Sequence, residues 1–336
     1  MDVPRRRMMG LAAAAALPIG HARAQDIRYF RIVTGGTQGT YFPIGGIIAG
    51  AISNPPGSRS CEDGGSCGVP GLLAAAQSSN GSVENVLAIG EGRVESGFTQ
   101  ADVAFWAFNG TSLFAETGPM GNLRAIARLY RESVHLVTLA RSGIASIGDL
   151  AGRRVALGEE GSGTLVDARS ILAAFGLGES AFEPVLMKPE KAGEALLGGA
   201  IDAFFIIAGY PTAAVRDLAE SDAIALVPIM GPVLDELLRT QPFFIRDFIP
   251  HDAYPGVAIT ETLSVGALWV VGAEQDDDLI HGITAALWHP STRKLLDEGH
   301  ARARDIRLES ALQGVPIPLH PGAERYYREV GLIGAL

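Results

Sequence analysis

The chain has 336 residues, 47% of them hydrophobic and 19% charged, with a formal net charge of −10 at pH 7. This length suits two domains, and the apolar fraction is ample for burying their cores. An acidic chain with no basic cluster after residue 7 is a poor nucleic-acid binder, because phosphate affinity depends on Lys and Arg. No internal stretch reaches the roughly 18–20 apolar residues of a membrane helix. The 42 glycines are the unusual feature, and where they lie matters most.

The N-terminus carries the three parts of a secretory signal. A positive region, Arg5-Arg6-Arg7, precedes a short apolar run over residues 8–19 and an Ala22-Arg23-Ala24 cleavage site. We therefore expect a signal peptide over residues 1–25, cleaved near Ala24, and a periplasmic mature protein. The arginine pair also fits a twin-arginine signal, with the Sec route left open. The alternative is a buried N-terminal helix.

The two cysteines, Cys61 and Cys67, lie in a Pro/Gly/Ser-rich segment over residues 54–71. In an oxidising compartment a pair so close in sequence favours one small structural disulfide. The alternative is a metal or redox pair, but the spacing is not Cys-x-x-Cys and no His stands nearby in the sequence.

After the signal, β-like apolar runs alternate with helix-like amphipathic runs, which predicts an α/β protein with largely parallel sheets. Strands are expected at residues 29–34, 96–99, 124–129, 135–140, 154–158, 203–208, 223–228 and 265–271. Helices are expected at residues 43–53, 83–91, 101–109, 164–174, 188–197, 211–221 and 277–287.

Three strand-to-helix junctions share one design, at residues 34–43, 158–164 and 208–212. Each places small residues, hydroxyls and free backbone N–H groups at a helix N-terminus, where carboxylate or phosphate binds without a formal positive charge. Open α/β sheets bind ligands at these carboxyl ends of strands. Because the first junction lies over a hundred residues from the others, we infer an anion held between two lobes. The alternative is that the glycines only cap helices and form tight turns.

The two junctions of the inferred anion site supply most of the candidate binding residues. They are Gly36, Thr37, Thr40 and Tyr41 in the first lobe and Gly161, Ser162, Gly163 and Thr164 in the second.

Further candidates have competing explanations. Ser82 and Asn85 lie at another predicted helix start, where Ser82 is as well explained as an N-cap. Gln100 and Asp102 follow a strand, and Asp102 could meet an ammonium group or cap the next helix. Tyr210 is the best candidate for an aromatic wall, with a core position nearly as plausible. Trp106 and Tyr254 are weaker candidates, more typical of a core.

Catalytic, nucleotide and metal motifs are missing from the sequence. Residues 158–163 have the wrong glycine order for dinucleotide binding, and residues 36–40 lack the Lys of a P-loop. Residues 64–68 match Gly-x-Ser-x-Gly, but no strand precedes them as a nucleophile elbow requires. The histidines show no metal-ligand spacing. We therefore expect neither catalysis, nor a metal, nor a cofactor.

The chain resembles the TAXI-type solute receptors of tripartite ATP-independent periplasmic (TRAP) transporters. The match runs in order from about residue 27 to the end. The segments that carry it are residues 35–41, 81–85, 100–104, 122–126 with 129–130, 161–164, 201–203, 208–212, 254–256 and 318–323.

The resemblance implies a type II periplasmic-binding-protein fold, with two α/β lobes, a ligand cleft between them and crossing strands. Lobe 1 is expected over residues 26–139, lobe 2 over 140–265, and a return to lobe 1 over 266–336. It also implies a small carboxylate ligand, such as a glutamate-like amino acid, a dicarboxylate or a 2-oxoacid. The partners implied are the integral-membrane TRAP subunits, and we expect a monomer.

The sequence departs from the family pattern in two places. The segment over residues 54–71 is longer than usual, and Arg131 stands where Pro is expected. The insertion could border the cleft and alter specificity. Two other functions stay open. A carboxylate-processing enzyme on the same fold would need a placed base or nucleophile, and a stand-alone periplasmic sensor would serve a partner other than a transporter.

Overall fold

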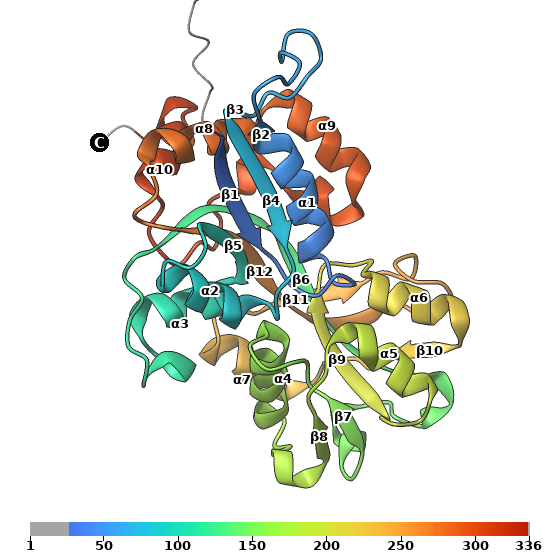
Figure 1. Cartoon of the computed structure of the whole chain (residues 1–336). Coiled ribbons are helices and arrows are strands. Elements are labelled where there is room, and N and C mark those ends of the chain that lie inside the picture. Colours follow the sequence, from blue (N-terminus) through green and yellow to red (C-terminus); the bar gives the residue numbers. More distant parts are fainter. Residues whose placement is uncertain (1–26, 335–336) are drawn as a thin grey trace, which may run out of the picture.

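A computed structural model describes residues 27–334 of the chain, so the predicted signal peptide lies outside the described residues. Within residues 27–334, no helix combines the length and apolar character needed to cross a membrane. The molecule is mixed α/β, with one large sheet running through it and helices packed on both faces (Figure 1).

The large sheet has ten strands, eight of them in the order β4-β1-β5-β12-β6-β9-β7-β8, with β10 paired to β6 and β11 to β12. Its strands are β1 (Arg28–Val33), β4 (Leu72–Gln77), β5 (Ser96–Gln100), β6 (Leu123–Leu139), β7 (Arg154–Ala156), β8 (Glu183–Val185), β9 (Ala203–Ala208), β10 (Ile224–Leu226), β11 (Ile245–Ile249) and β12 (Thr260–Gly272). A separate two-stranded sheet joins β2 (Ser53–Asn54) to β3 (Val69–Pro70).

The helices follow the strands in alternation over most of the chain. They are α1 (Tyr41–Ile52), α2 (Ser82–Gly90), α3 (Ala101–Asn109), α4 (Gly163–Ala174), α5 (Pro189–Leu197), α6 (Ala213–Ser221), α7 (Pro232–Thr240), α8 (Asp277–Leu287), α9 (Pro290–Gly299) and α10 (Pro321–Glu329). Short 3-10 turns fill several connections, among them η5 (Ala301–Asp305).

The two longest strands, β6 and β12, run through both halves of the molecule. On one side they join the parallel set β4-β1-β5, and on the other β6 joins β9, which continues into the parallel pair β7-β8. We call the first half, with α1–α3 and α8–α10, lobe 1, and the second, with α4–α7, lobe 2. The strands β6 and β12 pair antiparallel with each other, and their register shifts between Gly266 and Leu268. The boundaries expected at residues 139/140 and 265/266 stay predictions.

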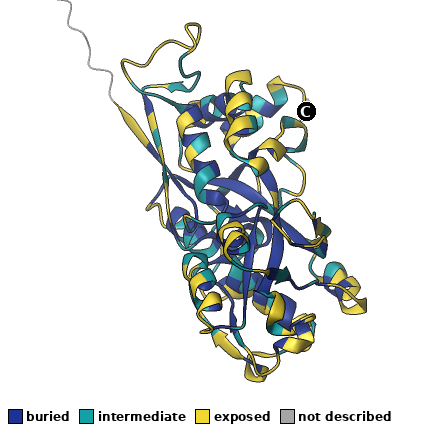
Figure 2. Ribbon diagram, turned by 90° about the vertical axis from the view of Figure 1, so that its right-hand side faces the viewer, coloured by how far each residue is buried: buried dark blue, intermediate teal, exposed yellow. Residues whose placement is uncertain are grey.

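The sheet is mixed rather than largely parallel, because the crossing strands are antiparallel to their neighbours. The two strands predicted at residues 124–129 and 135–140 are one strand, β6. In the sequence, the charged pair Arg131-Glu132 suggests a break between two strands. In the structure Glu132 is buried, and the strand continues through both residues. Figure 2 shows this buried sheet passing through the middle of the molecule, with exposed helical faces outside it.

The predicted elements did not include strands β2, β3, β4, β8 and β11 or helices α7, α9 and α10. Strand β4 reads Leu-Leu-Ala-Ala-Ala-Gln, and Leu and Ala favour helices, so its pairing with β1 overrides local propensity. Helices α7, α9 and α10 have largely polar exposed faces and few buried residues each.

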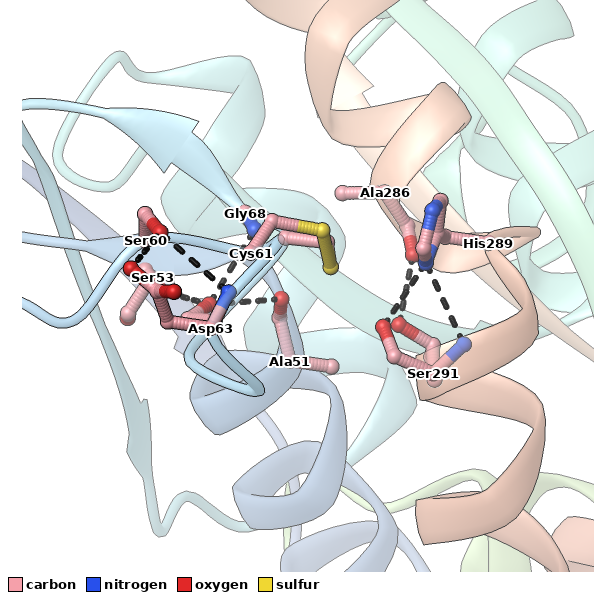
Figure 3. Close-up of a disulfide and its surroundings, with 12 residues drawn as sticks. Ala51, Ser53, Ser60, Cys61, Asp63, Gly68, Ala286, His289 and Ser291 are labelled. Carbon is pink, nitrogen blue, oxygen red and sulfur yellow. Dashed lines mark hydrogen bonds between the residues drawn. A yellow bond between two sulfur atoms is a disulfide. The ribbon is translucent and has the colours of Figure 1, made fainter.

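The predicted disulfide between Cys61 and Cys67 is confirmed, and it closes the loop between β2 and β3. Figure 3 shows it facing His289 and Ser291 at the start of α9. Among residues 27–334, Cys61, Cys67 and His289 are the one group whose ligand atoms lie close enough to hold a metal ion. While the disulfide is intact its sulfurs are not thiolates, so the group serves as a structural link.

Candidate ligand-binding site

The predicted junctions of the two lobes meet at one small cavity of about 60 Å³. A water molecule needs roughly 10–15 Å³ of such space, so the cavity suits a few waters or a small ligand. Eight of the sequence-predicted site residues line it: Gly36, Thr40, Tyr41, Ser82, Gln100, Ser162, Gly163 and Thr164. These residues come from the starts of α1, α2 and α4 and the end of β5.

Lobe 1 lines the cavity with the loop that follows β1 and with the first turn of α1. Thr40 is the N-cap position of α1, and Tyr41 is its first residue. The Tyr41 hydroxyl donates a 2.6 Å hydrogen bond to the Glu132 carboxyl group, which comes from the crossing strand β6. The wall of lobe 1 is therefore continuous with the strand that joins the lobes.

Lobe 2 lines the cavity with the first turn of α4. Ser162 caps this helix, because its Oγ accepts from the Leu165 backbone N–H at 3.1 Å. Within residues 27–334, the backbone N–H groups of Gly163 and Thr164 make no hydrogen bond. Free N–H groups at a helix N-terminus attract an anionic group.

A glycine at position 163 allows the two lobes to approach each other. A Cβ atom there would overlap the Gln100 side-chain oxygen and lie 2.9 Å from the Ser82 Oγ. Both of those residues belong to lobe 1, whereas Gly163 belongs to lobe 2. The glycine therefore serves close approach across the cleft.

Backbone and side-chain hydrogen bonds hold the lobes against each other. The Gly161 carbonyl accepts from the backbone N–H groups of Val83 and Glu84, at 3.1 and 3.0 Å, in the first turn of α2. The Thr40 hydroxyl donates to the Gly209 carbonyl at 2.7 Å. These bonds define a closed arrangement.

A second set of contacts joins residue 38 to lobe 2. The Gln38 carbonyl accepts from the Thr212 hydroxyl at 2.8 Å and from the Ala214 backbone N–H at 3.2 Å. Its backbone N–H donates to Glu190 at 3.2 Å. The N-termini of α2 and α6 are thus occupied by carbonyl groups of the opposite lobe, whereas the Gly163 and Thr164 N–H groups of α4 stay free.

Five of the predicted residues lie outside the cavity lining. Thr37 donates to Glu190 at 3.3 Å, and Gly161 lies in the loop before α4 with a left-handed φ of 86°. Asn85 is buried in lobe 1, where its side-chain N–H₂ donates to the carbonyls of Thr34 and Phe98. Asp102 is buried at the start of α3, and Tyr210 lines a different cavity.

The weaker candidates also lie outside the cavity. Trp106 packs at the edge of the core beside Phe243. Tyr254 is buried and hydrogen-bonded to His135 at 2.9 Å and to the Thr212 backbone N–H at 3.1 Å.

Two glutamates that were not predicted line the cavity, Glu132 and Glu159. Burial raises the pKa of Glu132 to about 8, the Tyr41 hydrogen bond opposes this, and the charge of Asp102 adds to it. Burial likewise raises the pKa of Glu159 to about 7. Glu132 is the one acidic residue among residues 123–139, and this was the signal in the sequence, because an acidic residue belongs in a buried strand only when it has a partner there.

A pair of buried carboxyl groups lies behind the cavity, Asp102 from lobe 1 and Asp167 from lobe 2. Each is at most 1% exposed, and the two side chains are close enough to hydrogen-bond when one is protonated. Burial raises the pKa of both groups, and the charge of Asp102 raises that of Asp167 further. Burial and the nearness of the two groups therefore favour the state in which one of them keeps its proton.

Two α/β lobes, crossing strands and a cavity between the lobes make up the architecture of periplasmic binding proteins. A protein from Bordetella bronchiseptica RB50 superposes with a TM-score of 0.51 at 18% identity, over 89% of this chain and 80% of its own. A protein described as a periplasmic transporter superposes with a TM-score of 0.51 at 13% identity, over 90% of this chain and 92% of its own. The periplasmic aliphatic sulphonate binding protein SsuA from Escherichia coli gives 0.45 at 13% identity, over 89% and 77%.

The chain belongs to the NMT1-like family, whose model matches residues 32–331. This match covers almost all of both lobes.

Proposed function

We propose that this protein is an extracytoplasmic solute-binding protein that captures a small organic anion by closing its cleft and delivers it to TRAP transporter membrane subunits. One observation carries the binding proposal: the glycine junctions of the two lobes line the same cavity and are joined by hydrogen bonds between the lobes. A ligand that contacts both lobes favours the closed state by its higher affinity for that state. The TRAP partner and the periplasmic location rest on the resemblance and on the predicted signal peptide.

The cavity lining offers both hydrogen-bond donors and acceptors. The free N–H groups of Gly163 and Thr164 suit a carboxylate. Beside Gly163, the buried Gln100 Oε1 has no hydrogen-bond partner, and Glu132 adds a carboxyl group to the cavity lining. An acceptor oxygen and a carboxyl group suit an ammonium or hydroxyl group.

Among the carboxylates implied by the resemblance, this arrangement favours an amino acid over a dicarboxylate or a 2-oxoacid. No Lys or Arg lines the cavity within residues 27–334. A ligand with two carboxylates and no ammonium group would therefore face Glu132 and Glu159 without a counter-charge. An ammonium group facing Glu132 would instead lower the pKa of that glutamate. The ionised carboxylate and the ammonium group would then balance each other's charge.

Isothermal titration with glutamate, 2-oxoglutarate and glutarate tests the proposal, because the three differ only at one carbon. We expect glutamate to bind best and to compact the protein in small-angle scattering. The Glu132→Gln variant should narrow the difference between glutamate and glutarate. Binding with no compaction contradicts the closure mechanism, and failure of all three ligands contradicts the ligand class.

Delivery is tested by uptake into vesicles that contain purified TRAP membrane subunits. Uptake should need both the binding protein and an ion gradient. Ligand binding without any uptake would leave a binding protein that serves another partner.

A further inference from the structure

A second cavity of about 270 Å³ lies where the lobes meet, on the other side of Gly209 from the cleft. Three arginines and two tyrosines line it: Arg128, Arg131, Arg302, Tyr130 and Tyr210. Lobe 1 supplies Arg302 from η5, the crossing strand β6 supplies Arg128, Tyr130 and Arg131, and lobe 2 supplies Tyr210. We call this the arginine cavity.

Two of the three guanidinium groups have no paired carboxylate, although the charge of Asp305 acts on Arg128. Within residues 27–334, the side chains of Arg128 and Arg131 make no hydrogen bond and no ion pair to any carboxylate. Arg128 is only partly exposed, and its burial and the charge of Arg131 lower its pKa. Arg131 is exposed, and two like charges this close together favour the arrival of an anion.

The third arginine, Arg302, is held in place but has one hydrogen-bond donor without an acceptor. The Arg302 guanidinium stacks 3.6 Å from the centre of the Tyr210 ring and pairs with Asp305. Its Nε is buried without a hydrogen-bond partner, and so is the Tyr130 hydroxyl. Buried donors without partners cost free energy, which a bound acceptor would recover.

Two aspartates, Asp247 and Asp305, also line the arginine cavity, and both already have partners. Asp305 pairs with Arg302, and Asp247 accepts from the Ser133 hydroxyl at 2.7 Å and from the Phe248 backbone N–H at 2.9 Å. Neither bonds to Arg128 or Arg131. The cavity therefore keeps an excess of positive charge and of donors.

The arginine cavity is separate from the cleft. Gly209 lies between them: a Cβ on it would contact the side chains of Arg302, Thr40 and Tyr130. The Thr40–Gly209 hydrogen bond closes the gap at this point. A ligand in one cavity does not fill the other.

We propose that the arginine cavity binds a small oxyanion, such as phosphate, sulfate or a carboxylate, as a second ligand distinct from the one in the cleft. Guanidinium groups bind such oxygens through paired, charge-assisted hydrogen bonds. Because both lobes and the crossing strand line the site, an anion there stabilises the closed arrangement.

Titration with inorganic phosphate, followed by calorimetry without any cleft ligand, tests this proposal. We expect saturable binding that weakens with added salt. Arg128→Gln and Arg131→Gln should each weaken it by at least about tenfold, since each removes one charge-assisted contact. Neither guanidinium bonds to the protein, so both variants should fold.

Arg169→Gln is the matched control, because it removes an exposed arginine that pairs with Glu179 on the surface of lobe 2. It should leave phosphate affinity unchanged, as should Tyr41→Phe in the cleft. Equal losses in Arg169→Gln mean a general charge effect and overturn the proposal. Losses in Tyr41→Phe place the anion in the cleft and also overturn it, and so does a wild-type chain that binds no phosphate.

Discussion

Tyr41 and Glu132 form a 2.6 Å hydrogen bond in which the two partners come from different parts of the chain, the first turn of α1 and the crossing strand β6. Tyr41 is 7% exposed and Glu132 is 3% exposed. Burial raises the pKa of Glu132 to about 8, from an ordinary value of 4.5. At neutral pH the folded protein therefore keeps a proton on Glu132 that the unfolded chain releases.

Glu132→Gln should flatten the dependence of stability on pH. A raised folded-state pKa means that the contribution of this carboxyl is fully present below pH 4.5 and is lost as the pH rises through about 8. The amide cannot ionise, so the variant should lose less stability than the wild type between pH 5 and pH 9. Urea unfolding at several pH values measures this, and equal slopes for the two proteins contradict it.

Asp167→Asn should stabilise the protein at neutral and alkaline pH. Both side-chain oxygens of Asp167 are buried without a partner, and its pKa and that of Asp102 are raised. An amide can donate to Asp102 without needing a proton from solvent, which should be worth roughly 1–3 kcal/mol of unfolding free energy. Asp217→Asn, on the exposed face of α6, is the control and should show little effect. A destabilised Asp167→Asn variant contradicts the shared-proton arrangement.

Gly163→Ala should weaken ligand binding by hindering closure. The added Cβ would overlap the Gln100 side chain of the other lobe, and overpacking of this kind costs about 1–3 kcal/mol. Ligand affinity should fall by about tenfold or more, with less compaction in small-angle scattering. Gly178→Ala is the matched control, since nothing lies within 4 Å of its Cβ position in the same lobe. Unchanged affinity in Gly163→Ala means that the bound state does not need this approach.

Thr40→Val should open the ligand-free protein. It removes the donor to the buried Gly209 carbonyl, at a cost of about 1–3 kcal/mol to the closed state. The radius of gyration measured without ligand should increase. Thr240→Val serves as the control, because its hydroxyl bonds only within its own helix, to Glu236 and Leu237. If both variants scatter like the wild type, the Thr40 bond does not hold the lobes.

Replacing both Cys61 and Cys67 by Ala should lower the unfolding free energy by about 2 kcal/mol, because the short loop then regains its freedom in the unfolded chain. Chemical unfolding measures the loss. Ligand affinity should stay as it is, since the disulfide lies beside α9 and outside the cleft lining (Figure 3). A loss of affinity would instead mean that the loop borders the cleft.

Features that depend on neighbours in the sequence could be predicted. Cys61 and Cys67 are six residues apart, so most conformations of the connecting loop keep the two side chains close enough to pair. The junctions around Thr40 and Gly163 combine a strand end, glycines and a helix start, and local geometry forces each into a loop that exposes N–H groups. Local secondary-structure propensity did not predict elements that depend on strand pairing. In β4, Leu and Ala residues form a strand because β1 lies beside them.

The sequence by itself determined the α/β class, the disulfide and the strand-to-helix loops, because these follow from periodicity and from residues close together in the chain. Only the tertiary structure decided which loops face each other, that Glu132 lies buried under Tyr41, and that Asp102 meets Asp167. It also brought Arg302 to Arg128 and Arg131, more than 170 residues away. Such groups acquire their charge state and their partners from burial, and burial depends on how distant segments pack together.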